Sequence, residues 1–121
     1  MKPTILIADD DPAGRKVIES VLINQDYNLE FASNGREVLK KAAELKPDLI
    51  LLDIMMPEMD GPSFCECVRQ DPELLTSQIL MMTGHDQPEQ IAEGLARGAD
   101  DFLSKAASKY EITARVQTGM R

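Results

Sequence analysis

The amino-acid sequence predicts an α/β protein with one parallel β-sheet that is covered by helices on both faces. Short apolar runs alternate along its 121 residues with segments whose apolar residues recur every three or four positions, which is the period of a helix. Two of the runs, "LILL" (residues 49–52) and "ILMM" (residues 79–82), are apolar at every position, as expected for central strands buried on both faces. Strands that alternate with helices are joined by right-handed crossovers, and such strands run parallel.

Five short runs are the expected strands. They are Thr4–Ala8, Asn28–Ala32, Leu49–Asp53, Ile79–Thr83 and Asp101–Ser104. Five strands and five helices in a chain of this length fit a flavodoxin-like fold, the doubly wound (βα)5 sandwich with strand order 2-1-3-4-5. Such a fold binds its ligands beyond the carboxyl ends of the strands, at the point where the strand order reverses.

The first two helices are expected from their start signals and their apolar spacing. Pro12 suits the first turn of a helix, where its missing N–H has no partner, and Asp11 before it suits the N-cap, a role worth about 1 kcal/mol. The second helix has Ser33 or Asn34 as its N-cap and ends before Pro47. The apolar residues at helical spacing are Val17, Ile18, Val21 and Leu22 in the first helix and Val38, Leu39, Ala42 and Leu45 in the second.

The other three helices follow the third, fourth and fifth strands. The third has Pro62 in its first turn, the fourth spans Gln87–Arg97 and ends at Gly98, and the last begins at Ser108 or Lys109. The residues expected on their buried faces are Phe64 and Val68 in the third helix, Ile91 and Leu95 in the fourth, and Ile112 and Val116 in the fifth.

Composition and charge restrict the classes of function. The formal net charge of −8 argues against direct nucleic acid contact by this domain, because such affinity comes largely from Lys and Arg. No apolar run approaches the ~18 residues of a membrane span, and the start of the chain lacks the features of a signal peptide. We therefore expect a single cytoplasmic domain over residues 1–121, either a whole protein or a module of a longer one. Cys65 and Cys67 are expected to be reduced structural thiols, since no further Cys or His lies near them to complete a zinc site.

Polar residues occur where four of the expected strands end. Asp9 and Asp10 follow the first strand, Asp53 ends the third, Thr83 ends the fourth and Lys105 follows the fifth. Taken singly, such residues are more often helix caps, strand formers or solvated side chains. Because the carboxyl ends of parallel strands share one edge of the sheet, we expect these residues to meet there and to form a functional site.

The chemistry of this set is narrow. Carboxylate oxygens together with water suit Mg²⁺. Two carboxylates about 4 Å apart repel by roughly 4 kcal/mol near a protein surface, and a bound dication would offset that cost. A carboxylate beside a metal can attack phosphorus and become an aspartyl phosphate, with a lysine and a hydroxyl to bind the phosphoryl oxygens. His85 we interpret as a residue lining the edge of the pocket rather than as a phosphohistidine or a metal ligand.

Four segments in order carry a resemblance to a known family. They are "IADDDP" (residues 7–12), "LLDIMMPEMDG" (51–61), "MMTG" (81–84) and "GADDFLSK" (98–105). With these segments the chain resembles the receiver domain of bacterial two-component response regulators, whose fold is that of the chemotaxis response regulator. The resemblance covers nearly all of the chain, and the segment around Asp53 is its most specific part.

The resemblance implies a phosphorylation site with a metal ion. Asp9 and Asp10 would be the acidic pair that holds Mg²⁺, together with Asp53 and the backbone carbonyl of Met55. Asp53 would accept a phosphoryl group from a histidine kinase or a histidine phosphotransfer protein. The domain would catalyse only its own phosphorylation and dephosphorylation at that residue. Asp11 is left as the helix cap, so that two of the three adjacent aspartates serve the ion and one serves the backbone.

The resemblance also implies a switch. Thr83 and Lys105 would bind the phosphoryl group, and Phe102 would be the aromatic residue that rotates inward when the threonine moves. The new conformation would control an output domain or an effector protein, and the fourth and fifth helices would be the face for a homodimer. One departure is Ala106, where the family usually has proline after a cis bond; a cis bond before a residue other than proline costs about 2.5–4 kcal/mol. The isomer of the Lys105–Ala106 bond is therefore open.

Two other functions fit parts of the pattern. A pseudo-receiver would bind a partner without phosphorylation, and Ala106 is its only support. A Mg²⁺-dependent aspartyl phosphohydrolase would use the same nucleophile. Enzymes of that kind often carry a second aspartate two residues after the nucleophile, and Met55 occupies that position here.

Overall fold

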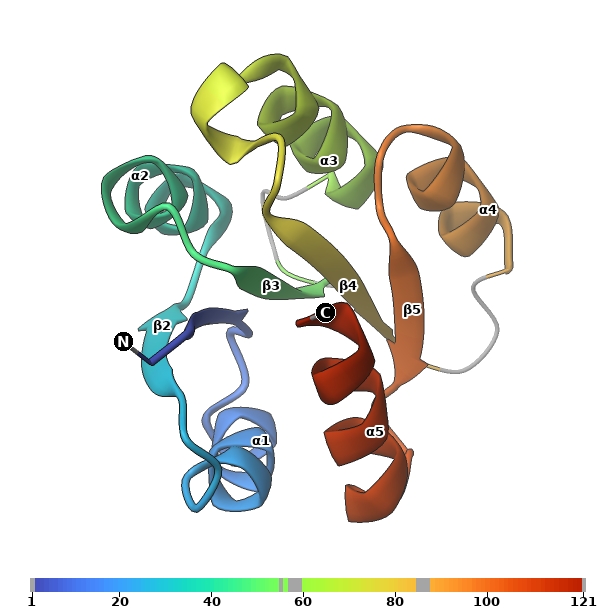
Figure 1. Ribbon diagram of the computed structural model, residues 1–121. Helices are drawn as coiled ribbons and strands as arrows, with labels where there is room; N and C mark the ends of the chain where they lie inside the picture. Colours follow the sequence, from blue (N-terminus) through green and yellow to red (C-terminus); the bar gives the residue numbers. More distant parts are fainter. Residues whose placement is uncertain (1, 55, 57–59, 85–87, 121) are drawn as a thin grey trace.

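The sheet has the predicted topology. The computed structural model describes residues 2–54, 56, 60–84 and 88–120. Its five parallel strands lie in the order β2-β1-β3-β4-β5 (Figure 1). The strands are β1 (Thr4–Ala8), β2 (Asn28–Ala32), β3 (Leu49–Asp53), β4 (Gln78–Thr83) and β5 (Asp101–Ser104). The predicted flavodoxin-like fold is confirmed, and only β4 differs in its bounds, since it begins one residue earlier at Gln78, which pairs with Leu49.

The helices lie on both faces of the sheet. They are α1 (Pro12–Leu22), α2 (Gly35–Leu45), α3 (Gly61–Gln70), α4 (Pro88–Ala96) and α5 (Lys109–Gly119), with a short 3₁₀ helix, η1 (Pro72–Leu74), that the sequence did not indicate. Figure 1 shows α2, α3 and α4 on one face of the sheet and α1 and α5 on the other. Each of the described helices is too short or too polar to cross a membrane.

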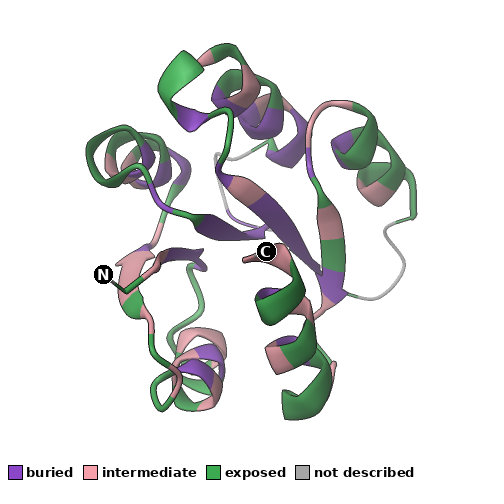
Figure 2. Ribbon diagram, viewed as in Figure 1, coloured by how far each residue is buried: buried purple, intermediate pink, exposed green. Residues whose placement is uncertain are grey.

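Two apolar cores are separated by the sheet. Successive side chains of a strand point to opposite faces, so Ile5 and Ile7 of β1 enter the core under α1 and α5, whereas Leu6 and Ala8 enter the core under α2 and α3. All four are fully buried, and Figure 2 shows the buried residues concentrated in the central strands. The rigid sheet that results fixes where the carboxyl ends of its strands lie.

Four of the α-helices begin with a side chain that accepts a hydrogen bond from a first-turn N–H. These N-caps are Asp11, Asn34, Asp60 and Ser108. The sequence left the start of two helices undecided. The structure shows that Asn34 and not Ser33 caps α2, and that Ser108 and not Lys109 caps α5. Asp11 accepts from the N–H of Ala13 at 3.1 Å, as its position before Pro12 predicted.

Replacing Asp11 by alanine is expected to lower the free energy of unfolding by about 1 kcal/mol, because the amide of Ala13 loses its acceptor. Urea unfolding of the purified chain measures this. Asp26→Ala, which removes an exposed carboxylate from the connection after α1, is the control and should leave the midpoint nearly unchanged. A well-folded Asp11→Ala protein of full stability that no longer binds Mg²⁺ would contradict the assignment.

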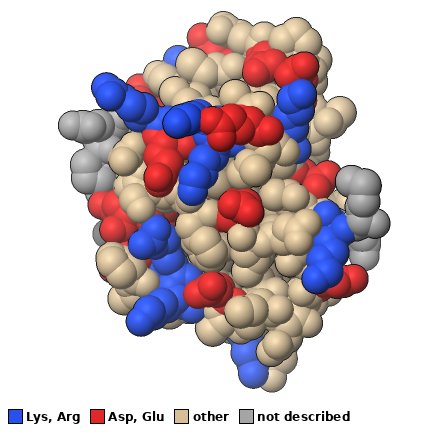
Figure 3. Space-filling model, turned by 90° about the vertical axis from the view of Figure 1, so that its left-hand side faces the viewer, with Lys and Arg blue, Asp and Glu red and all other residues tan. Residues whose placement is uncertain are grey.

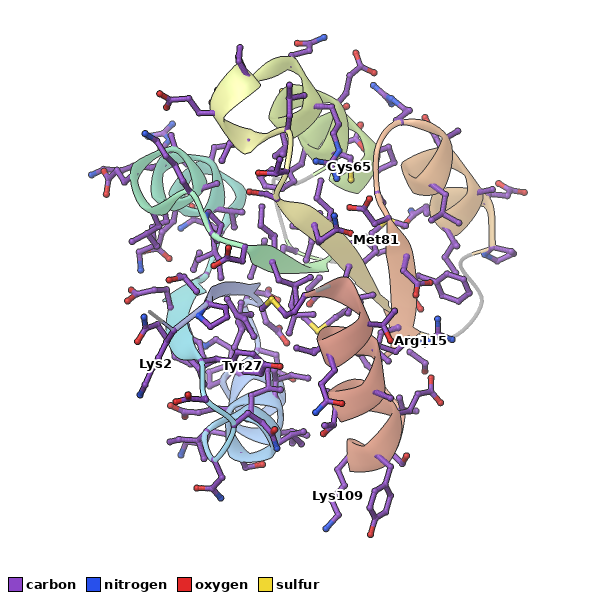
Figure 4. All side chains as sticks on the ribbon, viewed as in Figure 1. Lys2, Tyr27, Cys65, Met81, Lys109 and Arg115 are labelled. Atoms are coloured by element: carbon purple, nitrogen blue, oxygen red, sulfur yellow. The ribbon has the colours of Figure 1, made fainter. Side chains whose placement is uncertain are left out.

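In three helices the buried residues are not all those that the apolar spacing predicts. Val17 and Leu39 were expected on buried faces but are 55% and 45% exposed, while Ile18 and Val38 beside them are buried. In α4, Leu95 is exposed and Gly94 is buried instead. Met81 of β4 lies under α4 at this point (Figure 4), and a Cβ at Gly94 would stand 2.3 Å from its sulfur, so α4 approaches β4 closely where it carries no side chain.

Arg69 of α3 holds together the end of the molecule opposite to the carboxyl ends of the strands. Its guanidinium donates to the carbonyl of Gly98 at 2.9 Å and to that of Ser77 at 2.8 Å, and it reaches the Asp100 carboxylate at 2.6 Å. Longer bonds run to the carbonyls of η1 and the residue after it, Leu74 and Leu75. Asp100 in turn accepts from the N–H of Ile79 at the start of β4. One side chain thus joins α3, η1, β4 and the connection before β5.

Candidate functional site

Three aspartates meet at the carboxyl edge of the sheet. Carboxylate oxygens of Asp9, Asp10 and Asp53 all lie within 4.8 Å of one another. Asp9 follows β1 and Asp53 ends β3, and these two strands are hydrogen-bonded neighbours. Asp9 and Asp53 are each 1% exposed, whereas Asp10 is exposed to solvent. The structure therefore brings together the carboxylates that the strand ends predicted.

Lys105 reaches into this group from the connection after β5. Its Nζ lies 2.6 Å from Oδ2 of Asp53 and 3.6 Å from Oδ1 of Asp9. Its backbone N–H donates to the carbonyl of Thr83 at 2.8 Å, so the end of β4 holds the backbone of Lys105 in place. A single ammonium thus faces two buried carboxylates.

Alanine at position 106 is compatible with this position of the lysine. Among the described residues every peptide bond is trans, and the Lys105–Ala106 bond is one of them. Ala106, unlike a proline, has an N–H, and it donates to the hydroxyl of Ser104 at 3.1 Å. The connection is closed by this bond and by that from the N–H of Ala107 to the carbonyl of Ser104.

The other predicted site residues are placed only in part. Thr83 is buried at the end of β4, beside Ser104 of β5, and so lies at the same edge as Asp53. Phe102 lies on the edge strand β5 and is 38% exposed. Met55, expected to offer its carbonyl to a metal, and His85, expected at the edge of the pocket, lie outside the described residues.

Backbone hydrogen bonds hold Asp9 in place. Its backbone N–H donates to the carbonyl of Ala32, and its Oδ1 accepts from the N–H of Asp11 at 2.9 Å. Burial, the largest influence, raises the pKa of Asp9 above its usual range, although the Asp11 amide and the Lys105 charge act in the opposite direction. Burial would lower the pKa of Lys105, but the hydrogen bond to Asp53 and the charges of Asp53 and Asp9 raise it. Lys105 is therefore charged at neutral pH.

The raised pKa of Asp9 has a consequence for stability. A carboxyl whose pKa is higher in the folded protein than in the unfolded chain binds its proton more tightly when folded. Its ionisation therefore costs folding free energy, a cost that is absent below both pKa values and fully present above the folded one. At neutral pH the ionised Asp9 therefore destabilises the fold, an effect that the nearby ammonium of Lys105 reduces and that a bound divalent cation would reduce further.

The donor set fits a hard divalent cation. Three carboxylates from two neighbouring strands, two buried and one open to solvent, provide oxygen ligands and leave room for water, which is the coordination that Mg²⁺ prefers. Asp11 is not part of the group, because its carboxylate faces the backbone of α1. Cys65 is buried, with burial raising its pKa to about 11, and neither it nor the exposed Cys67 belongs to this set.

Replacing Asp9 by asparagine is expected to raise the unfolding temperature without divalent cations, by on the order of a few °C, because a costly buried charge is removed. The same variant should also lack the further rise that we expect Mg²⁺ to give the wild-type chain, since a ligand that binds only the folded state stabilises it. Thermal scans at neutral pH with Mg²⁺ or with EDTA measure both effects. Asp10→Asn is the matched control: it should lose the Mg²⁺ effect with less gain in stability, because Asp10 is exposed.

Gly14, in the first turn of α1, also lies against the acidic group, with its backbone next to the carboxylate of Asp9. Neither the apolar spacing nor the residues at the strand ends indicated that Gly14 would lie at the site. The only signal was a glycine close behind the three aspartates, in a segment that otherwise predicts a helix.

The chain is similar to known regulators over nearly its whole length. A family model described as the response regulator receiver domain matches residues 5–117. The chain is 40% identical over 121 residues to the alkaline phosphatase synthesis transcriptional regulatory protein PhoP of Bacillus subtilis, covering 100% of this chain and 50% of PhoP. It is 34% identical over 121 residues to the DNA-binding response regulator MtrA of Mycolicibacterium smegmatis, covering 100% of this chain and 52% of MtrA. The chain thus spans about half the length of these relatives.

Solved structures agree with this similarity. The chemotaxis response regulator CheY4 of Vibrio cholerae superposes with a TM-score of 0.90 at 32% identity, covering 98% of this chain and 99% of CheY4. A signal receiver domain of a response regulator from Bermanella marisrubri superposes with a TM-score of 0.90 at 29% identity, covering 100% of both chains. The match of the family model, the relatives and the strand order together show that the chain belongs to the response regulator receiver domain family of two-component signalling.

Proposed function

We propose that this domain is a phosphorylation-dependent switch that accepts a phosphoryl group on Asp53. The observation that carries the proposal is the arrangement around that carboxylate: two further aspartates within 4.8 Å and the ammonium of Lys105 at 2.6 Å. Receiver domains generally bind Mg²⁺ at such an acidic pocket. Asp9, Asp10 and Asp53 would hold the ion, with the carbonyl of Met55 as a further ligand. When bound, Mg²⁺ supplies charge neutralisation at the phosphoryl oxygens.

The phosphoryl donor would be a phosphohistidine of a kinase or of a phosphotransfer protein. A carboxylate oxygen of Asp53 attacks phosphorus, a P–O bond forms as the P–N bond breaks, and the bonding electron pair stays on the imidazole nitrogen. The ammonium of Lys105 then pairs with a phosphoryl oxygen instead of with the carboxylate of Asp53. The hydroxyl of Thr83, at the same edge of the sheet, donates to another phosphoryl oxygen. Water later cleaves the acyl phosphate, so that catalysis is limited to the domain's own phosphorylation and dephosphorylation.

The output would come from a change in population between two conformations. A group at Asp53 shifts that equilibrium only by its different stabilisation of the two states. Movement of Thr83 towards the phosphoryl group would leave room for Phe102 to turn inward from the edge strand, which alters the face formed by α4, β5 and α5. That face would contact an output domain, an effector or a second copy of the chain. PhoP is named a transcriptional regulatory protein and MtrA a DNA-binding response regulator, and this chain spans about half of each, so an output at DNA through a further part of the protein fits the proposal.

Direct nucleic acid contact by this domain is not part of the proposal. The formal net charge is −8. On the face formed by α2, β2 and α1, acidic and basic side chains are interspersed and no large basic patch is seen (Figure 3). Binding to nucleic acid requires Lys and Arg side chains gathered along the phosphates.

The proposal is tested by incubating the purified chain with acetyl phosphate or phosphoramidate and Mg²⁺. We expect the intact mass to rise by about 80 Da, one phosphoryl group, with no rise when EDTA replaces Mg²⁺. The added group should be lost on treatment with hydroxylamine, which cleaves acyl phosphates. A wild-type chain that gains no mass under these conditions would overturn the proposal.

The two alternative functions are separated from it by simple measurements. A pseudo-receiver would bind its partner equally well as wild type and as Asp53→Asn. Its support from Ala106 is weak, since Lys105 contacts Asp53 with alanine in that position. A phosphohydrolase would release phosphate from a small phosphoester over many turnovers, and the methionine two residues after Asp53 speaks against it.

A further inference from the structure

The first turn of α1 lies unusually close to the carboxylate of Asp9. Gly14 is the third residue of that helix, and a Cβ built on it would stand 2.7 Å from Oδ2 of Asp9 and 3.5 Å from its Cγ. Contacts of a Cβ below 3.0 Å are essentially never seen in proteins. Glycine is also a poor helix former, so local propensity does not explain its presence.

The carboxylate of Asp9 has little freedom to avoid such a Cβ. Its Oδ1 accepts from the N–H of Asp11 at 2.9 Å, and the same oxygen lies 3.6 Å from Nζ of Lys105. The residue is 1% exposed, so the side chain cannot turn outward into solvent without moving its surroundings.

We propose that Gly14 is a positioning residue for the acidic pocket: its missing side chain lets α1 begin directly over Asp9 and so sets the orientation of that carboxylate towards Asp10 and Asp53. As far as it concerns metal binding, this inference rests on the proposed function. Gly14 touches neither the phosphoryl group nor the ion in this proposal, and it acts only through Asp9. Outer residues that orient metal ligands typically change metal affinity by 10–100-fold, which is about the effect expected here.

The first test compares the Mg²⁺ dissociation constants of wild type, Gly14→Ala and Gly119→Ala by NMR chemical-shift titration. Gly119 lies in the last turn of α5, far from the acidic pocket, where a Cβ would stand 3.0 Å from Cδ1 of Leu49. It therefore controls for the same chemical change in another helix. We expect Gly14→Ala to bind Mg²⁺ about tenfold or more weakly and Gly119→Ala to bind as wild type does. Equal affinities for Gly14→Ala and wild type would overturn the inference, whereas a wild-type chain that binds no Mg²⁺ would overturn the metal site itself.

The second test needs no metal and stands apart from the proposed function. In the wild-type chain Gly14→Ala should lower the unfolding midpoint in EDTA, because the new Cβ meets Oδ2 of Asp9. In an Asp9→Ala background that oxygen is gone, and the same substitution should raise the midpoint, as alanine favours a helix over glycine. The change of sign is the expected result. If Gly14→Ala raises the midpoint equally in both backgrounds, Gly14 does not constrain Asp9 and the inference is wrong.

Discussion

Asp53→Asn is expected to abolish the gain of about 80 Da that the wild-type chain shows with acetyl phosphate and Mg²⁺. Asparagine has nearly the same shape as aspartate, but its amide oxygen carries no full negative charge and is a poor nucleophile. The substitution removes the repulsion between Asp53 and the two neighbouring carboxylates, but it also removes the ion pair of Lys105 with Asp53. Loss of the modification in a folded variant would therefore report lost chemistry and not lost structure. Intact-mass spectrometry measures the modification, and circular dichroism confirms the fold.

The matched control is Asp11→Asn, two residues after Asp9. Asparagine is as good an N-cap as aspartate, so this variant should keep both its stability and its mass gain. An Asp53→Asn protein that is still modified as completely as wild type would place the phosphoacceptor elsewhere, with the exposed Asp10 as the next carboxylate to examine. Such a result would contradict the proposed function.

The strands and the meeting of the acidic residues could be predicted because both follow from rules that act over a few residues. Runs such as residues 49–52, apolar at every position, are typical of strands buried on both faces, and the parallel order then places every carboxyl end at one edge. Asp9 and Asp53 needed no information from distant side chains to be placed together. The resemblance to receiver domains added which carboxylate would be the phosphoacceptor.

The rotation of the helices could not be predicted, because apolar spacing defines a stripe and not its centre. Ile18 and Val17 are equally apolar, yet only Ile18 is buried. In α4 the buried position belongs to Gly94, a residue with no apolar side chain, since the sulfur of Met81 fills the space that a side chain would take. Packing between elements far apart in the sequence decides these positions.

The reach of Lys105 shows a similar limit of motif-based reasoning. The family's usual proline suggests that the connection after β5 depends on it. In this chain the N–H of Ala106 and the hydroxyl of Ser104 close the connection instead, and Lys105 still lies 2.6 Å from Asp53. Only the hydrogen bonds of the folded chain show that this bond closes the connection where the family usually has proline.

Arg69→Met is expected to lower the free energy of unfolding by about 2–4 kcal/mol, the largest loss of stability that we predict for a residue outside the cores. Methionine keeps most of the apolar stem but removes every donor. The carbonyls of Ser77 and Gly98 then lose their partner at 2.8 and 2.9 Å, and the Asp100 carboxylate loses its cation. Arg69 is 22% exposed at its side chain, so water replaces part of what is lost and the loss is smaller than for a fully buried arginine.

Urea unfolding measures the loss, with Arg97→Met as the matched control. Arg97 also makes two ion pairs, to Glu66 and Glu93, but these are solvent-exposed and involve no backbone carbonyl, so little change in the midpoint is expected. Because Arg69 lies at the opposite end of the sheet from Asp53, folded Arg69→Met should still gain a phosphoryl group at the wild-type level at low temperature. Equal midpoints for the two arginine variants would show that the carbonyl contacts of Arg69 contribute no more than a surface ion pair. A folded Arg69→Met protein that cannot be modified would instead show that this end of the molecule controls the acidic pocket.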